Sequence, residues 1–125
     1  MEDQVSKKIL IVDDDQAFVR ALATFLGGHG YKVFIAQDAT FAIKHVAKEN
    51  IDLTILDLGL PSGGGFFVLE NIRKTRQIVQ MRIIVSTANI SPGIEKKSRD
   101  CGADDFIMKP YDLEKLLEMI KTHLM

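Results

Sequence analysis

Three consecutive aspartates, Asp13, Asp14 and Asp15, directly follow an apolar run at residues 9–12. One aspartate at such a place can cap the next helix, because its side chain accepts hydrogen bonds from the free N–H groups of the first turn. A cap needs only one carboxylate. The other two need a different role, and the polar residues that follow other apolar runs indicate which.

Three of these polar residues carry chemistry of their own. Asp57 follows the mostly apolar stretch at 53–56, Thr87 follows the strand pattern at 82–86, and Lys109 follows the stretch at 106–108. If the runs are parallel strands of one sheet, the site lies where their carboxyl ends meet. The sequence therefore predicts that several acids, one hydroxyl and one lysine converge on one edge of a sheet.

A cluster of three carboxylates needs positive charge to hold it together. Two carboxylates about 4 Å apart repel by roughly 4 kcal/mol at an effective dielectric constant near 20. Lys109 supplies only one positive charge. A hard divalent cation with oxygen ligands is the simplest way to supply the rest. Mg²⁺ fits best because it uses few carboxylates and keeps several waters, with Mn²⁺ as the alternative.

The chain alternates short apolar runs with longer patterns typical of amphipathic helices. Strands are predicted at 8–12, 31–36, 53–56, 82–86 and 106–108, and helices at 15–26, 39–48, 65–76, 91–100 and 112–123. Five β–α units in strict alternation predict an α/β fold, a doubly wound five-stranded parallel sheet with helices on both faces. We also predict that Gly27 and Gly28 stop the first helix, and that Ser91 caps the fourth with Pro92 as its first residue.

The composition restricts the class of protein. At 125 residues the chain has room for one domain, residues 1–125, and 46% apolar with 26% charged residues is typical of a globular chain. A net charge of −1 without a dense Lys or Arg cluster argues against direct binding to nucleic acid. We expect no membrane segment, because no apolar run is long enough. We expect a cytoplasmic location, because Cys101 is the only cysteine and the N-terminus lacks a secretory signal.

Four motifs, each at the end of its own predicted strand, resemble those of one known family. They are VDDD at 12–15, LDLGLPSGGG at 56–65, STA at 86–88 and DFIMKP at 105–110. In this order and at these separations they resemble the receiver (CheY-like) domain of two-component response regulators, over about residues 8–123. The resemblance implies the flavodoxin-like receiver topology. It also implies a phosphorylation-dependent signalling switch that catalyses only its own phosphorylation and dephosphorylation.

The resemblance assigns roles to the acidic residues. Asp57 would accept a phosphoryl group from a histidine kinase, a histidine phosphotransfer protein or a small donor such as acetyl phosphate. Asp14, Asp57 and the backbone carbonyl of Gly59 would bind Mg²⁺ directly, and Asp13 would hold it through water. Asp15 is left as the helix cap. The kinase would dock against the first helix, around residues 16 and 20.

The same resemblance assigns a phosphate-sensing and output role to the later motifs. Lys109, next to a cis bond to Pro110, and Thr87 would contact the phosphoryl group. Phe106 would be either a core aromatic or a switch residue that rotates inward when Thr87 moves. The output would be binding of a downstream protein, or self-dimerisation, through the face of the fourth helix, fifth strand and fifth helix. The candidates on that face are Ile94, Lys97, Phe106 and Lys115.

Some residues depart from the family pattern. Gly59 stands where many relatives carry a side chain, so we expect the phosphoryl group on Asp57 to be uncovered and short-lived, with Asn89 able to orient water. Glycines at 63–65 predict a mobile loop and a poor helix start. The fourth helix carries one large apolar residue, Ile94, and is expected to be weakly anchored. The histidines at 29, 45 and 123 are predicted to be surface residues, and Cys101 a small buried one.

Other classes of protein have to be weighed against this interpretation. A haloacid-dehalogenase type phosphatase would show Asp-x-Asp as at Asp13 and Asp15, but Ala17 stands where its Thr or Val belongs. A flavin or nucleotide carrier needs a Gly- or Ser/Thr-rich phosphate loop, and the acids here would repel a phosphate. A receiver that only docks and is not phosphorylated stays open. So does the receiver part of a longer regulator or hybrid kinase.

Overall fold

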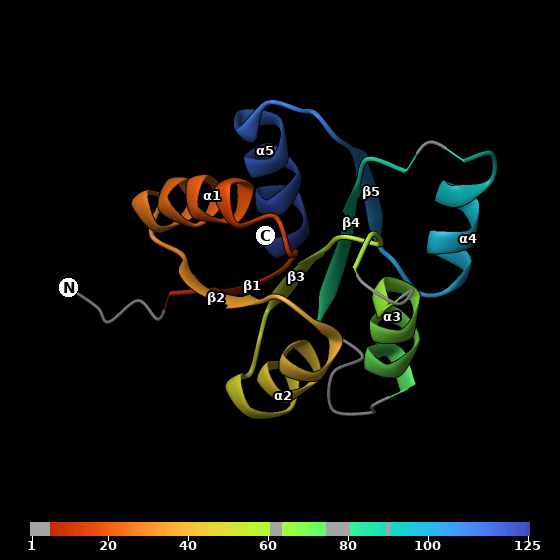
Figure 1. Ribbon diagram of the computed structural model, residues 1–125. Coiled ribbons are helices and arrows are strands. Elements are labelled where there is room, and N and C mark those ends of the chain that lie inside the picture. The colour runs from red at the N-terminus through yellow and green to blue at the C-terminus, as the bar shows by residue number, and fades with distance from the viewer. Residues whose placement is uncertain (1–5, 61–63, 75–80, 90) are drawn as a thin grey trace.

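The computed structural model describes residues 6–60, 64–74, 81–89 and 91–125. Its strands, β1 (Lys8–Val12), β2 (Lys32–Ala36), β3 (Leu53–Leu56), β4 (Arg82–Thr87) and β5 (Asp105–Met108), form one parallel sheet in the order β2-β1-β3-β4-β5. The helices are α1 (Gln16–Gly28), α2 (Ala39–Glu49), α3 (Gly64–Lys74), α4 (Ile94–Asp100) and α5 (Leu113–Leu124). Helices α1 and α5 cover one side of the sheet and α2, α3 and α4 the other (Figure 1). The predicted doubly wound α/β fold is confirmed.

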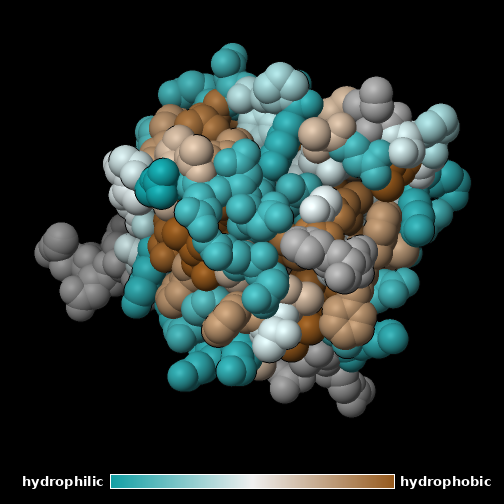
Figure 2. Space-filling model, viewed as in Figure 1, coloured by the Kyte–Doolittle hydropathy of each residue, from teal (hydrophilic) through white to brown (hydrophobic). Residues whose placement is uncertain are grey.

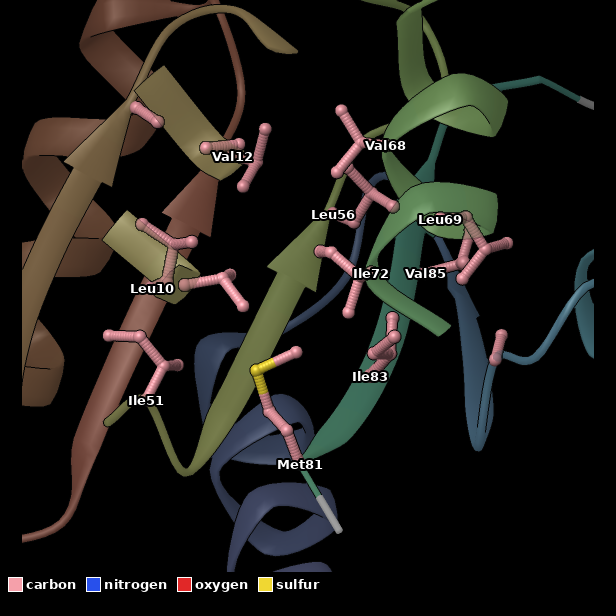
Figure 3. Packing of buried hydrophobic residues seen from close by; sticks show 14 of the residues in the cluster. Leu10, Val12, Ile51, Leu56, Val68, Leu69, Ile72, Met81, Ile83 and Val85 are labelled. Atoms are coloured by element: carbon pink, nitrogen blue, oxygen red, sulfur yellow. The ribbon is translucent and has the colours of Figure 1, made fainter. Parts of the chain in front are cut away.

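The strands are apolar on both faces because helices cover both faces. Along β1, Ile9 and Ile11 belong to the cluster under α1 and α5, whereas Leu10 and Val12 belong to the cluster under α2 and α3. All four side chains are fully buried. Figure 3 shows the cluster under α2 and α3, in which side chains of β1, β3 and β4 meet those of α3. This packing fixes the ends of the central strands, from which the polar residues of interest project.

Helix α1 begins as predicted and ends later. The side chain of Asp15 accepts a hydrogen bond from the N–H of Phe18 at 3.1 Å, which confirms Asp15 as the N-cap. The predicted stop at Gly27 and Gly28 is wrong, because the helix continues through Gly28. The left-handed turn that ends it lies at Gly30, where φ is 93°, a conformation that glycine adopts without steric cost.

Helix α4 begins at Ile94, and the predicted start at residues 91–92 is wrong. Its N-cap is Gly93, with φ at 80°, so no side chain caps this helix. The N–H of Ser91 instead donates a hydrogen bond to the side-chain oxygen of Asn89 at 2.9 Å. The only buried residue of α4 is Ser98. This shallow burial agrees with the expected weak anchoring.

Helix α3 begins one residue earlier than predicted, at Gly64. A Cβ on Gly65 would lie 2.4 Å from the Cα of Leu58, so glycine is required where α3 approaches the segment after β3. A Cβ on Gly64 would make ordinary contacts, the nearest at 3.5 Å from Leu60. The loop predicted to be mobile includes residues 61–63, which lie outside the described residues. The predicted helix end at residue 76 lies outside them as well. Among the described helices, none has the length and apolar character needed to cross a membrane.

Candidate functional site: an acidic cluster with a lysine

Sheet register brings the first two acids of the site together. Val12 pairs with Leu56, the last residues of β1 and β3, and the N–H of Asp57 donates to the carbonyl of Val12 at 2.9 Å. Asp13 and Asp57 therefore follow neighbouring strands at the same level. These two strands lie where the strand order reverses, which is where sites form in doubly wound sheets. Figure 2 shows hydrophilic residues gathered on the middle of the face in front of these central strands.

Lys109 reaches this pair from β5. Its backbone N–H donates to the carbonyl of Thr87 at 2.9 Å, which extends the pairing of β4 and β5 beyond Met108. Its Nζ lies 2.8 Å from Oδ2 of Asp13 and 3.3 Å from Oδ2 of Asp57. The bond from Lys109 to Pro110 is cis, as expected. The ammonium thus bridges two carboxylates that would otherwise repel each other.

Asp14 completes an acidic cluster. Carboxylate oxygens of Asp13, Asp14 and Asp57 all lie within 4.8 Å of one another. Three carboxylates beside the one ammonium of Lys109 give a net charge of −2 (−3 + 1). Hard oxygen donors and this excess charge fit a divalent cation such as Mg²⁺. The residues present therefore suit the metal that the sequence predicts.

Burial and ion pairing have opposite effects on the pKa values of Asp13 and Lys109. Burial raises the pKa of Asp13, and hydrogen bonds from Lys109 and from the N–H of Asp15 oppose this only in part. Burial by itself would lower the pKa of Lys109, but its contacts with Asp13 and Asp57 outweigh burial and raise that pKa. Lys109 therefore stays an ammonium through neutral pH. A permanent positive charge is held beside Asp57.

Comparisons with known proteins agree with this geometry. The family model of the response regulator receiver domain matches residues 9–121 of this chain. This chain belongs to that family. The receiver domain is 38% identical over 116 residues to the KDP operon transcriptional regulatory protein KdpE of Escherichia coli K12, covering 93% of this chain and 50% of KdpE. It is 35% identical to the regulatory protein VanRc of Enterococcus gallinarum, covering 96% of this chain and 51% of VanRc. The chain spans about half the length of these relatives.

Solved structures agree in the same way. A CheY-like receiver domain from Methanospirillum hungatei JF-1 superposes with a TM-score of 0.89 at 37% identity, covering 96% of this chain and 94% of that one. The chemotaxis response regulator CheY4 of Vibrio cholerae gives 0.88 at 27% identity, covering 95% and 99%. The chain is thus a receiver domain of two-component systems. The phosphatase and nucleotide-carrier alternatives are set aside.

Gly59 lies against the carboxylate of Asp57 in the receiver domain. Its N–H donates to Oδ1 of Asp57 at 2.9 Å, and a Cβ on it would lie 3.4 Å from the same oxygen. Even the first atom of a side chain would therefore cover this carboxylate. The role of the Gly59 carbonyl as a metal ligand stays a prediction.

Thr87 ends β4 at the same edge of the sheet and is almost fully buried. Its hydroxyl accepts a hydrogen bond from the N–H of Asn89 at 3.2 Å. The hydrogen bonds found among the described residues do not join Thr87 to Asp57. The threonine is in place at the strand end, and its contact with a phosphoryl group stays a prediction, as does the water-orienting role of Asn89.

Two of the four residues predicted for the partner-binding face line one groove. Phe106 and Lys115 line a groove of about 530 Å³ between β5 and α5, together with Met108 and Met119. Ile94 and Phe106 are half-buried and pack against the cluster under α2 and α3. Lys97 turns toward α3, where its Nζ lies 4.2 Å from the ring centre of Phe66. The structure therefore places Phe106 and Lys115 in one groove, which Glu95 of α4 also lines. The use of this face by a partner stays a prediction.

The sequence did not indicate several contacts around β5. His123, predicted to be a surface residue, is only partly exposed, and its ring nitrogen lies 2.9 Å from a carboxylate oxygen of Asp105, so the prediction is only partly right. His45 is also half-buried, beside the ring of Phe34, whereas His29 is exposed as predicted. Cys101 is only half-buried at the end of α4, so its predicted burial is only partly right. Long-range pairs of this kind leave no local pattern in a sequence.

Arg73 at the end of α3 was also missed. Its guanidinium pairs with Asp104 and donates to the carbonyls of Gly102 at 2.7 Å and Met81 at 2.8 Å. Gly102 has φ at 115°, and a Cβ there would lie 2.3 Å from the Cγ of Arg73. The glycine before β5 is the one signal that could have pointed to this close approach.

Proposed function

We propose that this receiver domain is a phosphorylation-dependent switch that accepts a phosphoryl group on Asp57 in a Mg²⁺-dependent reaction. The observation that carries the proposal is the position of Lys109, whose ammonium lies between Asp13 and Asp57 with Asp14 beside them. A fixed positive charge next to a partly exposed carboxylate suits transfer of a negatively charged group. The proposed donor is a histidine kinase or a histidine phosphotransfer protein.

The chemical step needs alignment and charge neutralisation more than covalent help. A carboxylate oxygen of Asp57 attacks the phosphorus of phosphohistidine, a P–O bond to Asp57 forms, and the P–N bond to the imidazole breaks. With acetyl phosphate the leaving group is acetate. Lys109 neutralises charge on the phosphoryl oxygens, and the hydroxyl of Thr87 donates to one of them. Hydrolysis by water returns the carboxylate and free phosphate.

The metal would be held by Asp14, Asp57 and the carbonyl of Gly59. Asp13 would act through water, in keeping with its contacts: Oδ1 accepts from the N–H of Asp15 at 2.9 Å and Oδ2 from Lys109 at 2.8 Å. Both oxygens of Asp57 also have partners, the N–H of Gly59 and the ammonium of Lys109, so the assignment of Asp14 and Asp57 as direct ligands rests on the likeness to the family. Bound Mg²⁺ would supply charge neutralisation at the transferred phosphoryl group.

The output step is a change in the population of two arrangements of the α4–β5–α5 face. Thr87 and Lys109 lie at the ends of β4 and β5, so their movement toward a phosphoryl group would be felt along those strands. Phe106 lies half-buried between the core and the groove beside α5, the place where a change in its orientation alters the surface. The proposed readers of that surface are a downstream protein or a second copy of the domain.

Intact-protein mass after incubation with acetyl phosphate and Mg²⁺ tests this function. We expect a gain of one phosphoryl group that is lost in Asp57→Asn and lost in the wild type when EDTA removes the metal. An unmodified wild-type protein that is well folded would contradict the proposal. It would favour a receiver that only docks.

A further inference from the structure

The ammonium of Lys109 has a third neighbour besides the two carboxylates. Its Nζ lies 4.4 Å from the centre of the Phe18 ring. A cation at this distance from the face of an aromatic ring is attracted by the ring quadrupole. The lysine side chain is largely buried, with 17% of its surface exposed, so water competes little for this contact. Phe18 thus belongs to the surroundings of the charge that the proposed reaction uses.

Phe18 is held in place at both its backbone and its ring. Its N–H donates to the capping carboxylate of Asp15, which fixes its place in the first turn of α1. Its ring meets the ring of Tyr111 edge to face, with centres 6.1 Å apart and planes at 89°. The Tyr111 hydroxyl lies 2.7 Å from the hydroxyl of Ser86, a fully buried residue next to Thr87. The aromatic pair therefore connects the start of α1 to the end of β4.

We propose that Phe18 is a positioning residue for phosphoryl transfer, holding the Lys109 ammonium where it can serve Asp57. This inference rests on the proposed phosphorylation of Asp57. Lys109 lies closer to Asp13 than to Asp57, and it must shift to follow charge that moves onto the phosphoryl group. A carboxylate partner would bind the ammonium at one point and add negative charge. A ring face attracts the cation without a formal charge and without a single contact point.

The test compares three variants in phosphorylation by acetyl phosphate at saturating Mg²⁺. Phe18→Leu keeps an apolar side chain and removes the ring, and we expect its rate constant to fall by between about threefold and tenfold. Phe18→Tyr keeps the ring and should stay near the wild-type rate. Phe25→Leu is the matched control, because Phe25 packs against the same cluster from the same helix and its ring pairs with His29 instead.

Two further measurements separate positioning from packing. In a Lys109→Met background, Phe18→Leu should cause no additional loss of rate, because a residue that acts through Lys109 has nothing left to act on. In NMR spectra of the wild type, the ε-methylene protons of Lys109 should lie upfield of the usual lysine value, because the ring shields them. This shift should disappear in Phe18→Leu and persist in Phe18→Tyr.

The outcomes distinguish this inference from the proposed function. A wild type that is not phosphorylated overturns both. A phosphorylated wild type with Phe18→Leu equally fast overturns the inference alone. Equal losses in Phe18→Leu and Phe25→Leu, or an unshifted Lys109 signal in the wild type, also overturn it. The wild-type NMR measurement holds even if Phe18→Leu fails to fold.

Discussion

Lys109 lies closer to Asp13 than to Asp57: its Nζ is 2.8 Å from Oδ2 of the first and 3.3 Å from Oδ2 of the second. Asp13 is 2% exposed, so the lysine rests on the more buried carboxylate and leaves Asp57 only partly paired. The arrangement places a positive charge beside the proposed acceptor, whose side chain is 13% exposed. Asp13 is also the nearer of the two carboxylates that hold Lys109.

Asp13→Asn should therefore weaken Mg²⁺ binding. The substitution removes a buried negative charge and the nearer partner of Lys109, and residues that support metal ligands typically contribute about tenfold or more to affinity. We expect the dissociation constant for Mg²⁺ to rise by about this factor in a metal titration. Asp15→Asn is the matched control, because asparagine also caps helices well and should leave the affinity unchanged. Equal affinities for Asp13→Asn and Asp15→Asn would argue against the role of Asp13.

Gly59→Met should lengthen the lifetime of the aspartyl phosphate. A Cβ on Gly59 would lie 3.4 Å from Oδ1 of Asp57, so a longer side chain covers the carboxylate and obstructs water. We expect dephosphorylation to slow by between about threefold and tenfold, a barrier increase of about 0.6–1.4 kcal/mol. The decay of phosphorylated protein after removal of the donor measures this. An unchanged decay rate would show that water access past Gly59 does not set the lifetime.

Two neighbouring glycines at the start of α3 should respond in opposite ways to substitution. Gly65→Ala places a Cβ 2.4 Å from the backbone of Leu58 and should lower the free energy of unfolding by about 1–3 kcal/mol. Gly64→Ala meets only ordinary contacts and should be neutral or stabilising by up to about 1 kcal/mol, since alanine favours the helix. Urea unfolding of both variants provides the comparison. Equal stability of the two would contradict the close approach at Gly65.

The free energy of unfolding should depend on pH through the carboxyl group of Asp105. Burial by itself would raise its pKa, but hydrogen bonds from His123, from the N–H of Phe106 and from Arg99 outweigh burial and lower that pKa below 3.8. The folded state therefore favours the ionised form. This stabilisation is fully present above the ordinary aspartate pKa and is lost as pH falls through the lower folded value.

Asp105→Asn should accordingly be less stable than the wild type near neutral pH, and the difference should shrink on acidification to about pH 3. Denaturant unfolding at several pH values measures it. Asp100→Asn is a suitable control, because Asp100 is exposed and pairs with Lys96 four residues earlier on the same helix. A difference for Asp105→Asn that stays constant over this pH range would contradict the lowered pKa.

Local patterns predicted the strands, the helices and the acids of the site because these depend on neighbours in the sequence. The N-cap at Asp15 follows from one hydrogen bond within the first turn, and Asp57 follows a strand that is mostly apolar and buried throughout. The start of α4 could not be predicted, because Ser91 and Pro92 have the right types for a helix start. In the structure the N–H of Ser91 donates to the Asn89 side chain, and the helix starts at Ile94, after Gly93.

Contacts between residues far apart in the sequence could not be predicted from local sequence patterns. The ring of Phe18 fits a core position equally well whether or not it faces an ammonium, and only the tertiary structure places it beside Lys109. The hydrogen bond between the hydroxyls of Tyr111 and Ser86 joins residues 25 apart in the sequence. Neither residue by itself indicates this partner. The residues that were missed are those whose role depends on a partner that folding brings near.

The most direct test of the central claim locates the phosphoryl group in the chain. Borohydride reduces an acyl phosphate to an alcohol and so converts a phosphorylated aspartate to homoserine. After treatment with acetyl phosphate, Mg²⁺ and borohydride, peptide mass spectrometry should find homoserine at position 57 and aspartate at positions 13 and 14. Homoserine at another position, or intact aspartate at 57 in a protein that gained a phosphoryl group, would contradict Asp57 as the acceptor.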